Sequence, residues 1–255
     1  MINGLIIIPT YNEAFNIVRL IDLILNQQGE EYKFDILVVD DNSPDGTSKL
    51  IADHQNFERN VFLIRRKKKE GRGSAVLEGF QFALKKGDYE QVIEMDGDFS
   101  HDPTELGKLL KKNQENDVTV GSRYLKNSKI IGWSLKRIIF SRLANFYARR
   151  VLRIPLQDYT NGYRCYKIDL LKVLDFSKIR SAGHILLSEI AYRFYLEGAK
   201  FCEIPTIFVN RRRGNSNVGF HEIKEAFFAI PRIYRTYAQE RHLFKSRQKQ
   251  GSAVV

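Results

Sequence analysis

Short apolar runs alternate with longer amphipathic stretches over the first 120 residues of the chain. The amphipathic stretches, such as NIVRLIDLILNQ and SAVLEGFQFALKK, repeat apolar residues with the period of a helix. The short runs are continuously apolar, as expected of strands buried on both faces of a sheet, and they read GLIII, DILVVD, VFLIR, QVIEM and DVTVG. This alternation predicts βαβ units, and therefore an α/β fold with a mostly parallel, Rossmann-like sheet flanked by helices.

Beyond residue 125 the pattern changes to long helical stretches that mix bulky apolar and basic side chains. These stretches read IIGWSLKRIIFSRLANFYARRVL and, from residue 221, HEIKEAFFAIPRIYRTYAQERHLFKSRQK. Because no repeat or low-complexity linker separates them, we expect one catalytic-type domain over residues 1–220 and a basic, amphipathic C-terminal extension over residues 221–255. Basic amphipathic helices suit an anionic membrane interface, but a core-packing helix with a charged outer face has the same pattern.

The net charge of +11 over 255 residues indicates a polyanionic partner, whether nucleic acid, an acidic membrane surface or a phosphorylated ligand. Hydrophobic residues form 43% of the chain, which is enough for a packed core and argues against disorder. No apolar run reaches the roughly 18 residues of a membrane-spanning helix, so we expect any membrane to be met from its side. Cys165 and Cys202 lack metal-site spacing, which favours the reduced thiols of a cytosolic protein.

Two predicted strands end in acidic residues, at the edge where open α/β sheets bind ligands. One leads into Asp40 and Asp41, and another leads into Asp96 and Asp98, with Gly97 between them. Paired carboxylates repel each other unless a cation neutralises them, and Mg²⁺ or Mn²⁺ bound in this way keeps waters and substrate phosphates as its other ligands. The pair therefore predicts a metal site, with the glycine admitting a ligand close to the backbone. The alternative is that Asp98 caps the next helix.

The first predicted strand ends in PTYNE, where an aromatic side chain stands among polar groups. Pro9 leaves the strand, and Tyr11 and Glu13 follow at the same edge of the sheet. An aromatic ring with polar neighbours suits stacking and hydrogen bonding to a nucleobase. The turn GRGSA, with glycines at 71 and 73, matches neither the dinucleotide-binding nor the P-loop fingerprint, which argues against those two classes.

In their order and spacing, PTYNE, DDNSPDGT, MDGD and GSRY resemble the motifs of family-2 inverting glycosyltransferases with the GT-A fold. Three further segments, GWSLKRIIFSRLAN, DYTNGYRCY and IPTIFVNRRRGNS, are similar to those of the polyprenol (dolichyl) phosphate mannose synthases. The resemblance runs from about residue 4 to residue 235. It implies a GT-A domain that transfers a hexose, by preference mannose from GDP-mannose, to a polyprenyl or dolichyl phosphate.

The resemblance also implies roles for individual residues. A Mg²⁺ or Mn²⁺ ion would be held by Asp96 and Asp98, while Glu189 occupies a matching acidic position of less defined role. The implied nucleotide-sugar-binding residues are Pro9, Tyr11, Glu13, Asp40, Asp41, Asp96, Gly97, Asp98, Ser100 and Arg211. The implied catalytic residues, with the arginines placed around the donor and acceptor phosphates, are Asp98, Arg123, Arg137, Arg211 and Asp158.

Some positions depart from the family pattern, and two other functions stay open. Asn217 stands where the family has a lysine, and Ser100 offers a weak third metal ligand at best. A GT-A enzyme that uses a UDP-sugar and a saccharide hydroxyl, with Asp158 as the base, would carry similar motifs. The remote alternative is a non-catalytic lipid- or nucleic-acid-binding protein.

The resemblance implies the compact form of these enzymes, without a transmembrane domain. The expected partners are a sugar nucleotide, a polyprenyl phosphate, a membrane surface and, for reaching the lipid, either the chain's own amphipathic helices or a membrane protein. Nucleic acid is not among them. The expected location is cytoplasmic, peripheral to the cytoplasmic face of a membrane.

Overall fold

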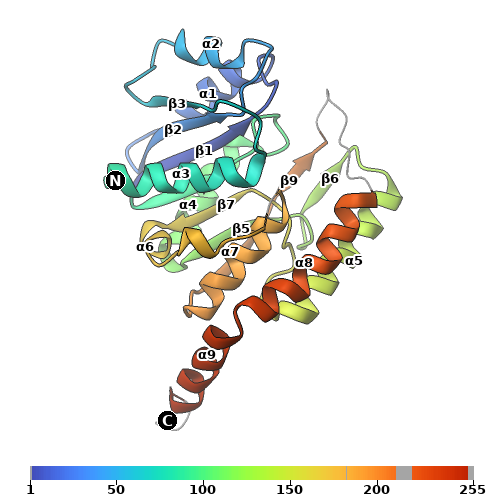
Figure 1. Cartoon of the computed structure of the whole chain (residues 1–255). Helices are drawn as coiled ribbons and strands as arrows, with labels where there is room; N and C mark the ends of the chain where they lie inside the picture. The colour runs from blue at the N-terminus through green and yellow to red at the C-terminus, as the bar shows by residue number, and fades with distance from the viewer. Residues whose placement is uncertain (1, 182, 211–219, 252–255) are drawn as a thin grey trace.

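The computed structural model describes residues 2–181, 183–210 and 220–251. The strands in this part of the chain are β1 (Ile2–Thr10), β2 (Tyr32–Asp40), β3 (Val61–Arg65), β4 (Gln91–Glu94), β5 (Val118–Ser122), β6 (Lys129–Ile131), β7 (Arg164–Lys167), β8 (Phe201–Pro205) and β9 (Ile207–Val209). Seven of them form one sheet in the order β3-β2-β1-β4-β7-β5-β8 (Figure 1). β7 runs antiparallel to both of its neighbours, and the other neighbouring pairs are parallel, which confirms the predicted mostly parallel sheet.

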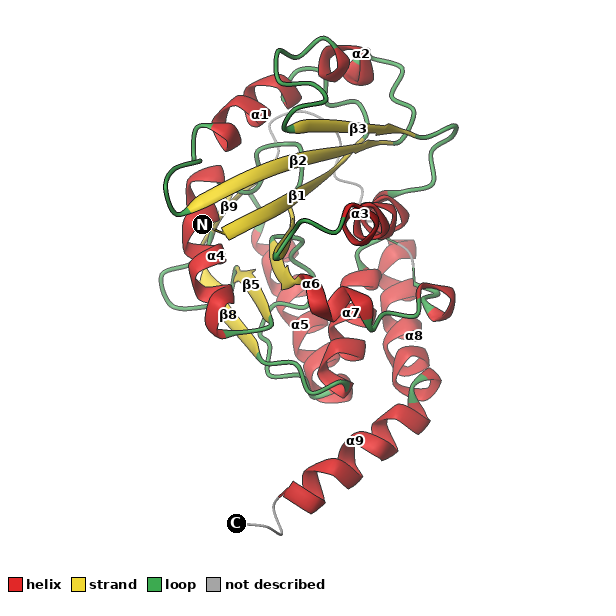
Figure 2. Cartoon of the chain, turned by 90° about the vertical axis from the view of Figure 1, so that its left-hand side faces the viewer, coloured by secondary structure: helices red, strands yellow, loops and turns green. Residues whose placement is uncertain are grey.

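Helices cover both faces of this sheet (Figure 2). The helices in the described part of the chain are α1 (Ile17–Leu25), α2 (Thr47–Ala52), α3 (Arg72–Lys86), α4 (Leu106–Glu115), α5 (Leu135–Leu152), α6 (Ile168–Lys172), α7 (Ile185–Leu196), α8 (Phe220–Thr236) and α9 (Ala238–Gly251), with short 3-10 turns η1 (Pro103–Glu105) and η2 (Phe176–Lys178). A two-stranded parallel sheet of β6 and β9 lies apart from the main sheet.

The central strands are buried on both faces because successive side chains of a strand point to opposite sides. In β1, Leu5 and Ile7 join the core packed against α3 and α7, whereas Ile6 and Ile8 join the core packed against α1 and α4. All four side chains are fully buried. This explains why the apolar runs of the sequence show no alternation.

The C-terminal helices differ in how closely they join the body of the molecule. From α8, Ile230 and Ile233 belong to the main hydrophobic core, and the following Tyr237 does too. α9 projects away from the rest of the chain in both views (Figures 1 and 2). α8 packs on α5 and α7 and is not a detached segment. The domain boundary expected after residue 220 stays a prediction. Within the described residues, no helix combines the length and the apolar character needed to cross a bilayer.

Candidate active site

A pocket of about 310 Å³ opens where β1, β2 and β4 end and α3 begins. Since neighbouring parallel strands present their carboxyl ends at one edge of the sheet, this is the predicted location of a ligand site. The residues that line the pocket are Pro9, Thr10, Tyr11, Glu13, Asp41, Lys69, Gly71, Arg72, Ala75, Asp96, Gly97, Asp98, Ser100, Arg137, His184, Phe208 and Asn210.

Most of the site residues predicted from the sequence meet in this pocket. They are Pro9, Tyr11, Glu13, Asp41, Asp96, Gly97, Asp98, Ser100 and Arg137. Three predicted residues do not line it: Asp40, Arg123 and Asp158. Arg211 and the Asn217 departure lie outside the described residues.

The two aspartates after β4 form the acidic wall of the pocket. Asp96 Oδ1 accepts a hydrogen bond from Arg72 Nε at 2.9 Å, and Asp98 Oδ1 accepts one from the Ser100 backbone N–H at 3.0 Å. Burial raises the pKa of Asp96, but the charge and hydrogen bond of Arg72, together with the neighbouring His101 and His184 rings, outweigh burial and hold this pKa below its ordinary value. Asp96 is therefore a charged carboxylate at neutral pH.

The cap of the following 3-10 turn comes from Asp102, not from Asp98. The Asp102 carboxylate accepts a hydrogen bond from the Thr104 N–H at 2.9 Å, and it is the N-cap of η1. The capping alternative for Asp98 was therefore wrong. Asp98 is partly exposed and lines the pocket.

The chemistry of the acidic pair fits a hard divalent cation. The described part of the chain contains no group of three or more His, Cys, Asp or Glu residues that could hold a metal ion. Mg²⁺ and Mn²⁺ do not need such a group, because they bind through one or two carboxylates and complete their shell with waters and substrate phosphates. Asp96 and Asp98, both partly exposed on the pocket wall, provide these carboxylates.

Gly97 lines the pocket and also packs closely against the end of β1. A β-carbon at this position would lie 3.2 Å from Thr10 Cγ2 and 3.3 Å from Ile8 Cγ2. The missing side chain thus makes room for the end of β1. The expected second role of this glycine, close approach of a ligand to the backbone, stays a prediction.

His101 ties the acidic loop to a segment more than fifty residues further along the chain. Its Nδ1 accepts the Asp96 backbone N–H at 3.1 Å, so its Nε2–H donates to Asn161 Oδ1 at 2.9 Å. The ring is fully buried and stacks on Tyr163 at a centroid distance of 4.9 Å. This bridge fixes the backbone that carries Asp96.

Tyr11 and Asp41 form the side of the pocket that the sequence assigns to a nucleotide base and ribose. Tyr11 is 38% exposed, and Lys69 Nζ lies 3.6 Å from the centre of its ring. Asp41 Oδ1 accepts from Arg66 Nη1 at 2.7 Å, and its Oδ2 accepts from the Gly71 N–H at 2.7 Å. The carboxylate therefore orders the loop that leads into α3.

Asp40 is a structural residue at the end of β2, outside the lining of the pocket. It is fully buried and accepts hydrogen bonds from the hydroxyls of Thr10, Ser43 and Ser48. With these bonds it joins the ends of β1 and β2 to the start of α2, and no free edge of it faces the pocket. The expectation that Asp40 touches the nucleotide is therefore corrected.

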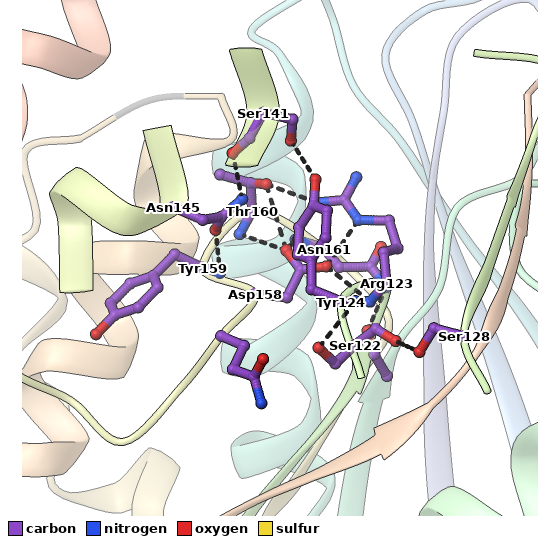
Figure 3. A network of polar contacts seen from close by, with 12 residues as sticks. Ser122, Arg123, Tyr124, Ser128, Ser141, Asn145, Asp158, Tyr159, Thr160 and Asn161 are labelled. Atoms are coloured by element: carbon purple, nitrogen blue, oxygen red, sulfur yellow. Dashed lines mark hydrogen bonds and ion pairs between the residues drawn. The ribbon is translucent and has the colours of Figure 1, made fainter. Parts of the chain in front are cut away.

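Arg123 and Asp158 form a buried ion pair next to the pocket but not in its lining (Figure 3). The Arg123 guanidinium lies 5.3 Å from the ring centre of Phe208, which does line the pocket. Arg123 Nε donates to Asp158 Oδ2 and Nη2 donates to Oδ1, both at 2.7 Å. The Asp158 oxygens also accept the backbone N–H groups of Arg123, Thr160 and Asn161. The Asp158 carboxylate is fully buried and occupied by these partners, which argues against its expected role as a base. The expected role of Arg123 around the substrate phosphates stays a prediction.

Glu189 is likewise structural. Its side chain is almost completely buried and accepts hydrogen bonds from the Tyr237 hydroxyl at 2.8 Å and from the Ser181 N–H at 2.8 Å. It therefore ties α7 to the junction of α8 and α9.

Arg137 reaches the pocket from the first turn of α5. That turn is capped by Ser134, whose hydroxyl accepts the Arg137 N–H at 3.3 Å. The guanidinium stacks 4.0 Å from the centre of the Trp133 ring, and its Nη1 donates to Asn210 Oδ1 at 3.2 Å. The cap and the stacking hold a cation in the same pocket as the acidic wall.

Several residues of the pocket were not predicted from the sequence. The glycines of GRGSA indicated a turn, and the arginine between them, Arg72, was assigned no role. Lys69 and His184 lie in none of the quoted motifs. The residues that lie inside quoted motifs but were assigned no site role are Thr10, Ala75, Phe208 and Asn210.

The family profile described as Glycosyl transferase family 2 matches residues 5–174, which contain the acidic wall and the strand ends just described. The chain belongs to this glycosyltransferase family. It is therefore an enzyme, and the non-catalytic binding-protein alternative is set aside.

Two curated relatives of this family 2 glycosyltransferase match over most of their length. The polyprenol monophosphomannose synthase of Mycolicibacterium smegmatis is 35% identical over 232 residues, covering 89% of this chain and 84% of the relative. The undecaprenyl-phosphate mannosyltransferase of Micrococcus luteus is 34% identical over 228 residues, covering 89% and 92%.

Solved structures with low sequence identity share the fold. The mannosyl-3-phosphoglycerate synthase from Rubrobacter xylanophilus aligns with a TM-score of 0.65 at 17% identity, covering 94% of this chain and 76% of that one. The glucosyl-3-phosphoglycerate synthase from Mycobacterium tuberculosis, in complex with Mn²⁺, UDP and glucosyl-3-phosphoglycerate, aligns with a TM-score of 0.63 at 14% identity, covering 94% and 80%. These likenesses support the expected GT-A architecture.

Proposed function

We propose that this family 2 glycosyltransferase transfers mannose from GDP-mannose to a polyprenyl or dolichyl phosphate, with inversion at the anomeric carbon. The observation that carries the proposal is that Asp96, Asp98 and Arg137 line one pocket. A sugar nucleotide with its cation suits the acidic wall, and an acceptor phosphate suits the arginine. The names of the two curated relatives support the same substrates.

The transfer needs no general base from the protein. A phosphate monoester with a second pKa near 6 is already largely anionic at neutral pH. Its oxygen attacks the anomeric carbon while the bond from that carbon to the diphosphate oxygen breaks, and GDP leaves with the electron pair. Mg²⁺ or Mn²⁺ held by Asp96 and Asp98 would neutralise the charge that develops on the leaving diphosphate.

The protein's own residues orient the two substrates. Tyr11 offers a ring for the guanine base, with Asp41 and Lys69 on the same side of the pocket. Arg137, held by Trp133 and Asn210, positions the acceptor phosphate by guanidinium–phosphate hydrogen bonds. This separates a donor side, at the ends of β1 and β4, from an acceptor side at the start of α5.

A panel of sugar nucleotides tests this function directly. We expect GDP-mannose with Mn²⁺ to raise the unfolding temperature more than UDP-glucose or UDP-GlcNAc with Mn²⁺, since ligand at 100 times its Kd stabilises a fold by about 2.7 kcal/mol. We also expect label from GDP-mannose to pass into solvent-extractable lipid when polyprenyl phosphate is supplied. Greater stabilisation by a UDP-sugar, with transfer to a soluble saccharide, would replace the proposal with its alternative.

That alternative, a UDP-sugar with a saccharide hydroxyl acceptor, has less support from the site. A hydroxyl acceptor requires a base to remove its proton. The residue expected to act as base, Asp158, is fully buried and paired with Arg123. The presence of UDP in a structural neighbour at 14% identity concerns that protein's donor.

We further propose that α5 and α8 place the pocket against the cytoplasmic face of a membrane, where the lipid acceptor is presented. Basic residues such as Lys136 and Arg150 are exposed along α5, and the guanidinium carbon of Arg150 lies 5.1 Å from the centre of the Phe146 ring. Residues spaced by three or four share a helix face. The exposed large apolar side chains of α5 are Leu135, Ile139, Leu143 and Phe146, and those of α8 from residue 227 onward are Phe227 and Phe228.

Vesicle flotation measures this association. The double variant Ile139→Asp/Leu143→Asp is expected to lose about tenfold or more in binding to vesicles containing anionic lipid, because both side chains would otherwise be buried in the interface. The matched control is Leu50→Asp on α2, which is 39% exposed at a distant part of the fold (Figure 1). Equal binding by all three proteins would contradict the proposal and favour delivery of the lipid by a membrane-protein partner.

A further inference from the structure

Arg72, the first residue of α3, already occupies the acidic wall of the pocket. Its Nε donates to Asp96 Oδ1 at 2.9 Å, and its Nη1 lies 3.3 Å from Glu94 Oε2. Glu94 is fully buried at the end of β4, and its other oxygen accepts the Tyr166 hydroxyl at 2.7 Å. One guanidinium thus pairs with two carboxylates, and its side chain is 16% exposed.

The surrounding chain is shaped to hold this guanidinium. Its Nη2 donates to the Gly162 carbonyl oxygen at 3.5 Å. A β-carbon at Gly162 would collide with the same nitrogen, so glycine is required there while Arg72 keeps its position. Arg72 is therefore a built-in part of the pocket and not a surface cation that happens to reach it.

The position of Arg72 conflicts with a divalent cation at Asp96 when no donor is present. A guanidinium and a dication at the same carboxylate repel each other, and the repulsion is strong where water is partly excluded. A nucleoside diphosphate adds negative charge in the same pocket, which relieves this repulsion. The guanidinium and the divalent cation can therefore both bind at Asp96 only when the negative phosphates of the donor offset their mutual repulsion.

We propose that Arg72 is a resident counter-ion that makes binding of the divalent cation at Asp96 depend on binding of the donor diphosphate. The inference rests on the proposed function, because it requires a nucleoside diphosphate donor. Its consequence is that the metal and the donor enter the site cooperatively, with Arg72 as the positioning residue that sets the coupling.

The test measures Mn²⁺ binding instead of turnover. Free Mn²⁺ is followed by its EPR signal as the full chain is titrated, with and without GDP. In the wild type, GDP is expected to tighten Mn²⁺ binding about tenfold. Arg72→Leu is expected to bind Mn²⁺ alone about tenfold more tightly than the wild type and to lose most of the GDP effect. Arg72→Lys, which keeps the charge, is expected to retain that effect.

Gly162→Ala provides an independent variant, since it displaces the guanidinium without removing it. It should also bind Mn²⁺ alone more tightly than the wild type, and it carries the test if Arg72→Leu does not fold. Unchanged or weaker Mn²⁺ binding by the folded variants, with an unchanged GDP effect, would overturn the role of Arg72. If the wild type binds Mn²⁺ but neither GDP nor GDP-mannose, the proposed function fails, and the coupling fails with it.

Discussion

Replacing Asp98 with alanine is expected to lower mannosyl transfer by about 10³-fold, because a metal ion on a leaving diphosphate contributes several kcal/mol of transition-state stabilisation. The fold should survive. The Asp98 carboxylate accepts a local hydrogen bond from the Ser100 N–H, and the loss of such a bond costs about 1 kcal/mol. Activity and stability should therefore separate in this variant.

Two measurements check this separation: the rate of label transfer from GDP-mannose to polyprenyl phosphate, and the midpoint of urea unfolding. The matched control is Asp102→Ala, four residues away, which removes the cap of η1 at a cost of about 1 kcal/mol and leaves the acidic wall intact. The control should keep most of its turnover. A rate for Asp98→Ala within tenfold of the wild type would remove Asp98 from the metal site.

The convergence of Tyr11, Asp41 and Asp96 on one pocket was predictable from the sequence. Each follows a strand whose continuous apolar character marks it as central, and β2, β1 and β4 are neighbours in the sheet. The carboxyl ends of parallel neighbours meet at one edge whatever the details of packing. This rule places a residue at the edge of the sheet without information about which side chains it contacts.

Residues whose role depends on a distant partner were not predictable in this way. Arg123 follows β5, and its motif predicts a place in the site just as the motifs of the pocket-lining residues do. Its guanidinium turns instead to Asp158, 35 residues later, in the loop that leads to β7. β7 is the antiparallel strand inserted between β4 and β5, which no periodicity of the sequence indicates.

Arg72 is the converse case, a residue that lines the pocket although its sequence motif did not single it out. The segment GRGSA attracts attention through its glycines, but its chemical content is the arginine between them. The pairing of Arg72 with Asp96 spans 24 residues, and the space for it depends on Gly162, a further 66 residues along the chain. The local sequence predicts the turn, but the position of the Arg72 guanidinium depends on residues that only the tertiary structure brings to it.

Removing Arg123 from the buried pair is expected to have the largest effect on stability. Arg123→Leu leaves Asp158 fully buried without its cation, and breaking such a pair costs about 3–5 kcal/mol. The loss is measured by urea unfolding at pH 7. The double variant Arg123→Leu/Asp158→Leu, which leaves no uncompensated charge, should recover part of it. The exposed pair Lys172–Asp169 supplies the control, since Asp169→Asn should change the midpoint little.

The stability lost in Arg123→Leu is expected to depend on pH, in a direction set by the pKa of Asp158. Burial raises the pKa of Asp158, but the charge and hydrogen bonds of Arg123 lower it by more, so the folded-state pKa lies below its ordinary value. In the wild type this contribution is complete above the unfolded-state pKa, near 3.9, and is lost as the pH falls through the folded-state pKa. In Arg123→Leu the burial penalty prevails and the pKa of Asp158 rises, so the deficit relative to the wild type should shrink between pH 7 and pH 5. A variant as stable as the wild type at both pH values would instead mean that Arg123 is free to turn to the pocket, as its motif implied.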